Sequence, residues 1–201
     1  MSAVHQMKKI TQQEFDALPV VGGYKQCPGE TDYSAIKRFH DRCRFAEGCS
    51  FGERCRFGAW CSFGAWCSFG AWCRFAERCS FAERCSLAER CSFGERCRFG
   101  AWCSFGDACS FEGHKARTSN PYIAIDRAGS TLRKTYFFDF EDGIYVRSGC
   151  FFGSLSEFRV KVLADERGAM STVKSMQYLG MANIAAVTFG RRDLIDWGTG
   201  K

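Results

Sequence analysis

The chain has 201 residues, of which 46% are hydrophobic and 25% are charged, and its formal net charge is +6. This balance is typical of a folded protein and excludes a disordered chain. No apolar run approaches the roughly 18 residues of a membrane span, and the first residues lack the apolar core of a secretory signal. We therefore expect a cytoplasmic protein without membrane contact.

The cysteines follow an unusual pattern. Twelve of the fourteen lie six residues apart, from Cys43 to Cys109. Structural zinc sites need closely paired cysteines, and no C-x-x-C pair occurs. We expect reduced thiols that fill a repeated small apolar position. The sequence predicts no metal site, no cofactor and no catalytic residue.

Residues 1–36 are expected to form a lead-in that caps the rest of the chain. The run Thr11-Gln12-Gln13-Glu14 is a capping box, which predicts a short helix that ends before Pro19.

Residues 37–114 form an internal repeat with a period of six, with units such as C-S-F-G-A-W and C-S-F-A-E-R. Cys and Phe lie two residues apart with Ser or Arg between them, which fits a short strand with Cys and Phe inward. A helix is excluded because a six-residue spacing drifts around a helical turn. The regular period therefore predicts a solenoid.

Shifted in frame, each unit reads Phe, Gly or Ala, two variable residues, Cys, and Ser or Arg. This resembles the hexapeptide repeat of left-handed parallel β-helix proteins, in which three units form one triangular coil. Phe stands where that family usually has Leu, Ile or Val, and only Leu87 conforms. The resemblance implies a mainly β fold, a left-handed parallel β-helix of about four coils over residues 37–114. It also implies a homo-oligomer, because many members of that family are trimers.

Three units per coil place residues three units apart in one column. The outward columns are then Ser50, Ser68, Ser86 and Ser104 on one face; Arg44, Ser62, Ser80 and Arg98 on a second; and Arg56, Arg74, Ser92 and Ser110 on a third. Trp60, Trp66 and Trp72 fall at three successive corners. Trp66, Arg84 and Trp102 share a column, which favours cation–π stacking. The Glu-Arg pairs of other units are expected to form solvated salt bridges.

Residues 115–201 are expected to form a small α+β domain. Residues 122–125, 136–140 and 144–146 read as three strands. Ser154 to Glu157 is a second capping box that begins a helix to about residue 164, and residues 172–188 read as a second helix, loosened near Gly180. Phe158, Val162, Met176 and Leu179 are expected core residues. Cys150 is interpreted as a structural cysteine in a turn.

The leading functional hypothesis is a non-enzymatic protein that binds and inhibits a partner. Trp and Arg are enriched at interface hot spots, so the candidate partner-binding residues are Trp60, Trp66, Trp72, Trp102, Arg56 and Arg74. The alternative interpretation is that the Trp side chains only shield corners or pack on neighbouring segments.

The Cys-Phe-Gly units and residues 136–162 also resemble repeat proteins of bacteriophages and prophages. This resemblance implies a host protein or complex, such as a defence component, as the partner in the bacterial cytoplasm. One alternative is a hexapeptide-type acyltransferase, for which His40 and His114 are the candidate bases. The other is nucleic-acid binding by residues 115–201, which hold thirteen basic and nine acidic residues; nucleic acid is the less favoured partner.

Overall fold

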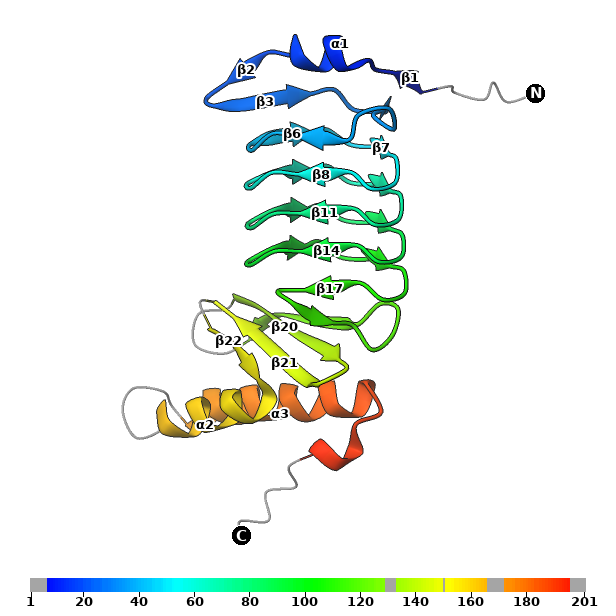
Figure 1. Ribbon diagram of the computed structural model, residues 1–201. Helices are drawn as coiled ribbons and strands as arrows, with labels where there is room; N and C mark the ends of the chain where they lie inside the picture. The colour runs from blue at the N-terminus through cyan, green and yellow to red at the C-terminus, as the bar shows by residue number, and fades with distance from the viewer. Residues whose placement is uncertain (1–6, 129–132, 150, 166–171, 196–201) are drawn as a thin grey trace, which may run out of the picture. The chain divides into compact units, whose positions relative to one another are not determined.

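The computed structural model describes residues 7–128, 133–149, 151–165 and 172–195. The chain divides into two compact units, residues 1–120 and 121–201. The first is a three-sided solenoid of parallel strands, and the second combines an antiparallel sheet with helices (Figure 1).

Three six-stranded sheets form the sides of the solenoid. The serine sheet consists of β1 (Lys8–Lys9), β4 (Thr31–Asp32), β7 (Ser50–Phe51), β10 (Ser68–Phe69), β13 (Ser86–Leu87) and β16 (Ser104–Phe105). The arginine sheet consists of β5 (Arg38–Phe39), β8 (Arg56–Phe57), β11 (Arg74–Phe75), β14 (Ser92–Phe93), β17 (Ser110–Phe111) and β18 (His114–Lys115). The mixed sheet consists of β2 (Val20–Val21), β3 (Tyr24–Cys27), β6 (Cys43–Phe45), β9 (Ser62–Phe63), β12 (Ser80–Phe81) and β15 (Arg98–Phe99).

The strand register confirms three units per coil. Ser68 pairs with Ser50 on one side and with Ser86 on the other, in parallel. Each sheet holds five or six parallel strands, so the solenoid has about five turns rather than the four expected. The additional turn comes from the lead-in, because Tyr24–Cys27 pairs with Cys43–Phe45, and Asp32 pairs with Ser50.

Stacked phenylalanine rings fill the interior of the solenoid. Phe69 lies parallel to Phe51, with ring centroids 4.7 Å apart, and edge-on to Phe63 at 4.9 Å. The same two geometries recur from coil to coil, and the Phe side chains of the repeat are 2–4% exposed. Offset and edge-on ring pairs stabilise a core beyond simple burial. This packing gives the Phe side chains of the repeat their structural role.

The cysteines lie beside these rings and hydrogen-bond to the neighbouring coil. The thirteen described cysteines are free and buried, as the sequence predicted. Each thiol of the central repeat points to a carbonyl 21 residues earlier, as in Cys79 to the Gly58 oxygen at 3.3 Å and Cys103 to the Ala82 oxygen at 3.2 Å. The cysteine is therefore both a small apolar filler and a donor that links successive coils.

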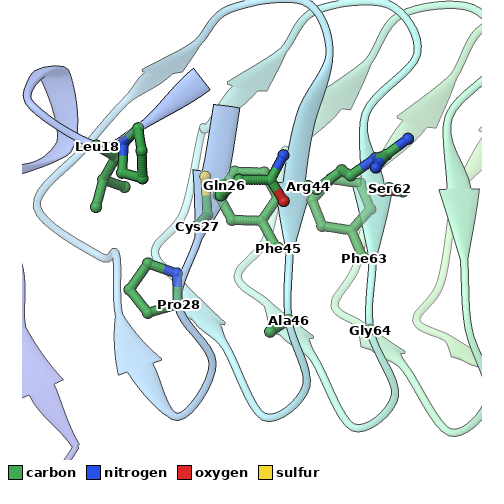
Figure 2. Close-up of a pocket in the computed structure, with 11 residues that line it drawn as sticks. Leu18, Gln26, Cys27, Pro28, Arg44, Phe45, Ala46, Ser62, Phe63 and Gly64 are labelled. Atoms are coloured by element: carbon green, nitrogen blue, oxygen red, sulfur yellow. The ribbon is translucent and has the colours of Figure 1, made fainter. Parts of the chain in front are cut away.

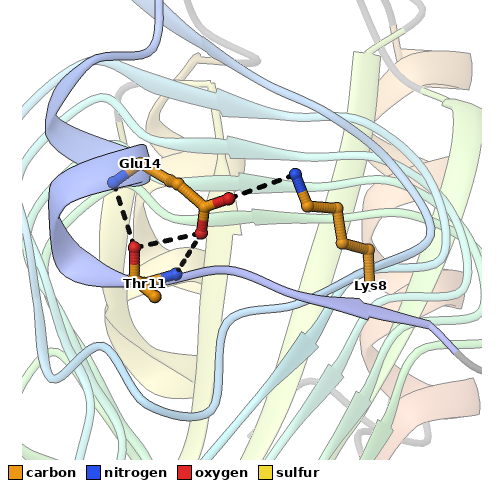
Figure 3. Close-up of polar contacts among 3 residues, drawn as sticks. All are labelled: Lys8, Thr11 and Glu14. Atoms are coloured by element: carbon orange, nitrogen blue, oxygen red, sulfur yellow. Dashed lines mark hydrogen bonds and ion pairs between the residues drawn. The ribbon is translucent and has the colours of Figure 1, made fainter.

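The short helix α1 (Gln12–Asp16) covers the first ring of the core. Its fully buried Phe15 packs edge-on against Phe39, with centroids 5.3 Å apart. The capping box is formed as predicted: the Glu14 amide donates to the Thr11 hydroxyl at 3.2 Å, and the Thr11 amide donates to the Glu14 carboxylate at 2.8 Å (Figure 3). Lys8 adds an ion pair to Glu14 at 3.2 Å, and these contacts lower the Glu14 pKa, with the Thr11 backbone bond the largest cause.

The second unit has one strand more than the sequence predicted. Its sheet runs β19 (Tyr122–Ala128), β20 (Arg133–Phe140), β21 (Gly143–Ser148) and β22 (Phe151–Ser154), and its helices are α2 (Leu155–Asp165), α3 (Thr172–Thr188) and the short 3-10 helix η1 (Arg192–Leu194). The Ser154 capping box at the start of α2 is confirmed by the Ser154 amide, which donates to Glu157 at 2.7 Å. α3 continues through Gly180.

The core of the second unit lies between this sheet and the two helices. Phe158 and Val162 belong to it, as expected, and Leu179 packs against it. The prediction for Met176 was wrong, because its side chain is 67% exposed. Tyr178 and Met181 occupy the buried face of α3 instead.

Candidate functional site

The corners of the solenoid share one strained backbone conformation. The residue before each repeat cysteine has a positive φ, +61° at Trp60 and +58° at Arg78 for example. From Arg42 to Arg90, the amide of this residue donates to a carbonyl of the next coil, as in Trp60 to the Glu77 oxygen at 3.1 Å. Glycine fits this left-handed region best, and a bulky side chain there is an outlier. Backbone geometry therefore does not explain why four of these positions carry Trp.

One complete coil, residues 55–72, carries Trp at all three corners. Trp60 is 41% exposed, Trp66 is 58% exposed and Trp72 is 44% exposed, whereas Trp102, farther along, is 80% exposed. The strand order places Trp60 between the arginine and mixed sheets and Trp72 between the serine and arginine sheets. Trp66 and Trp102 lie at the third corner. The coil 55–72 contains no acidic residue.

An arginine of the following coil stacks on each of these three rings. The guanidinium carbon lies 4.5 Å from the ring centroid for Arg78 over Trp60, and 4.7 Å for both Arg84 over Trp66 and Arg90 over Trp72. The stacking predicted for Arg84 on Trp66 is thus confirmed and recurs at every corner. The expected salt bridges are not formed, because among the described residues these arginines make no ion pair with the glutamates that precede them.

Arg56 and Arg74 lie together on the outer side of the arginine sheet, which we call the arginine face. Both are exposed and are in parallel register, and Arg38 extends the row by one coil. The structure thus brings Arg56 and Arg74 to a face bordered by Trp60 and Trp72, and leaves Trp66 and Trp102 at the opposite corner. Sequence reasoning missed Arg38 because its unit is degenerate, although Phe39 marks the register.

A groove of about 710 Å³ crosses the mixed sheet near the first coils (Figure 2). Apolar side chains and backbone from three stacked coils line it, together with Leu18 and Pro19. Its titratable lining groups are Cys27 and Arg44. A hydrogen bond with Cys43, followed by burial, raises the Cys27 pKa. His40 and His114, the candidate bases, do not line this groove.

Hydrogen bonds between stacked thiols raise the pKa of one partner and lower that of the other, as in Cys49, whose pKa is lowered by its bond with Cys67. The pKa of Cys67 is raised to about 12 by its hydrogen bond with Cys49 and by burial. A bond with Cys85, followed by burial, raises the pKa of Cys103. Cys67 and Cys103 therefore stay protonated at neutral pH, which suits donors to carbonyls and not nucleophiles. Cys150, the other cysteine of interest, lies outside the described residues.

Several basic side chains of the second unit are engaged within that unit. Arg147 is buried, with its guanidinium 4.7 Å from the Phe152 ring centroid. Arg159 donates to Asn183 at 2.8 Å and to the Leu194 carbonyl at 2.7 Å, and Arg191 lies 3.5 Å from the buried Asp139. These contacts give the three arginines structural roles.

No protein-family model, curated protein or solved structure matches this chain. Among the described residues, no helix is both long and apolar enough to cross a membrane.

Proposed function

We propose that this protein is a non-enzymatic binding protein whose solenoid contacts another protein. The observation that carries the proposal is the coil 55–72, which presents an exposed Trp at every corner. Other coils carry Arg, Ala or Gly at equivalent corners with the same positive φ, so the fold does not require Trp there. Exposed Trp beside Arg is the composition of interface hot spots.

The proposal extends to the biological setting. The likeness of the Cys-Phe-Gly units and residues 136–162 to phage repeat proteins supports a phage-encoded chain that inhibits a host protein in the bacterial cytoplasm. Self-association into a homo-oligomer belongs to the same proposal, since exposed corner Trp residues suit either kind of contact.

The experiment replaces Trp60, Trp66 and Trp72 with Arg and the preceding Ala residues with Glu. Stacked Glu-Arg units already occur naturally at Arg78 and Arg96, so we expect an unchanged circular dichroism spectrum and melting temperature. Affinity capture from bacterial lysate with nuclease treatment should recover one host complex with the wild type and none with the variant. Light scattering should show self-association of the wild type only.

Four results would contradict the proposal. Undiminished capture by the variant would exclude the corner Trp residues as the contact. Retained coenzyme A or acetyl transfer would favour the acyltransferase, and capture that disappears with nuclease would favour nucleic-acid binding. A monomer of 22.7 kDa at micromolar concentration would exclude the homo-oligomer.

A further inference from the structure

We propose that the arginine face is the docking surface and that its occupant is an acidic segment of a protein partner. This inference rests on the proposed binding function and adds which side of the solenoid binds and which chemistry it recognises. The corner Trp residues point to three different edges, so one rigid partner surface meets at most the two that border a single face.

The arginine face carries like charges in direct register. Arg38 pairs with Arg56, and Arg56 pairs with Arg74, in parallel strands. Neighbouring strands lie about 4.8 Å apart, and like charges directly opposite one another destabilise a sheet. The same column continues with Ser92 and Ser110, which shows that the fold accepts a neutral residue there. An arginine row therefore costs stability that an anionic ligand would recover.

These three arginines are free to bind. All are exposed, and among the described residues none of them makes an ion pair, a side-chain hydrogen bond or a ring contact. On the mixed sheet, by contrast, the guanidinium of Arg44 lies 4.0 Å from the Tyr24 ring centroid. The arginine face thus carries a row of stacked arginines whose side chains make none of these contacts.

Apolar and neutral residues flank the middle of the row. Trp60 and Trp72 border the face, and the residues that precede them are Ala59 and Ala71, where most other units carry an acid. The coil 55–72 therefore offers no carboxylate to Arg56; the acidic residues beside it are Glu53, three residues earlier, and Asp41, which accepts a hydrogen bond from the Ala59 amide at 2.8 Å. A partner with carboxylates surrounded by apolar side chains would complement both parts of this surface.

Two other occupants fit less well. Proteins bind single-stranded nucleic acid by stacking its bases on open aromatic rings. Arg78 and Arg90, however, already cover one side of the Trp60 and Trp72 rings. A second copy packed arginine face to arginine face would bring the two basic rows together, which charge repulsion disfavours. An acidic protein segment meets neither obstacle.

The test measures binding of fluorescein-labelled poly-L-glutamate to the full-length protein by fluorescence anisotropy. The test variant is Arg56→Ser/Arg74→Ser, and the matched control is Arg44→Ser/Arg98→Ser on the mixed sheet. Both lose two positive charges, and both introduce the residue that the same column carries elsewhere. We expect the test variant to bind at least about tenfold more weakly and to melt no lower than the wild type, and we expect the binding of the control to change less than about twofold.

Equal weakening in the two variants would overturn the inference, because general charge would then explain the binding. Tighter binding of a single-stranded oligonucleotide of equal charge, lost in the same test variant, would assign the face to nucleic acid instead. The proposed function can stand while this inference fails: host capture would then depend on Trp60 and Trp72 but not on Arg56 and Arg74. Loss of capture on Trp66→Arg alone would move the docking surface to another corner.

Discussion

Replacing one central ring tests whether stacking or burial holds the solenoid together. Phe69 is 4% exposed, stacks on Phe51 at 4.7 Å and meets Phe63 and Phe75 edge-on at 4.9 Å and 5.2 Å. Phe69→Ala removes the ring and leaves a cavity, which should lower the free energy of unfolding by about 3–5 kcal/mol. Phe69→Leu retains most of the buried volume, as Leu87 does in the next coil.

The leucine variant isolates the ring contacts. It loses five ring pairs. The three closest are worth about 0.5–1.5 kcal/mol each, so we expect a cost of at least about 2 kcal/mol. Urea unfolding under reducing conditions, followed by both circular dichroism and Trp fluorescence, gives the two free energies. A leucine variant as stable as the wild type would refute the stacking argument. An alanine variant that loses less than about 1 kcal/mol would refute the tight core itself.

Three further predictions concern the thiols, the glycines and the second capping box. The raised pKa values of Cys67 and Cys103 mean that the folded state keeps protons that the unfolded chain loses above about pH 8.5. The free energy of unfolding from urea titrations should therefore fall between about pH 7.5 and pH 9.5, by about 1.4 kcal/mol for each of these two thiols. A Cys67→Ala/Cys103→Ala variant should show a smaller fall, and a fall as large as that of the wild type would contradict the assignment. Gly58→Ala should destabilise, since its Cβ would approach the Asp41 amide nitrogen to 2.5 Å, whereas Gly180→Ala, with open space in α3, should stabilise by up to about 1 kcal/mol; thermal melts of the pair check the contrast. Ser154→Ala should cost about 1 kcal/mol in urea unfolding by removing the α2 cap, and an unchanged midpoint would show that α2 does not depend on it.

Much of the solenoid could be predicted because its signal is local and repeated. Each Cys-x-Phe triplet predicts that its Cys and Phe side chains point inward, and the period of six predicts which residues stack in one column. The first turn was not visible in this way, because Tyr33 and Ile36 fill the core without the repeat pattern. The sequence predicted a turn at β22 because Gly149 precedes this strand and Gly153 lies within it.

The candidate site was predictable in part. The exposed corner Trp residues follow from the exchange of Trp and Arg at equivalent unit positions. The stacking of Arg78 on Trp60 joins residues in successive coils, so it depends on the number of units per coil and not on which residues are adjacent in the sequence. The isolation of the arginine row is a property of side-chain contacts, which sequence patterns do not reveal.

Three six-residue units complete one coil, and this has a consequence for how such a chain can change in length. Gain or loss of one unit between residues 55 and 90 would preserve the strand pattern and the inward rings, yet shift every later side chain onto the next side of the prism. Loss of one unit between Arg56 and Arg74 would split the stacked arginine row across two sides. The remaining Trp residues would still lie next to an arginine of the following coil, because Arg78, Arg84, Arg90 and Arg96 hold consecutive corners. Gain or loss of three units would instead restore each column. The core therefore tolerates the gain or loss of a single unit. The arrangement of the arginine row on one side is preserved only when whole coils of three units are gained or lost.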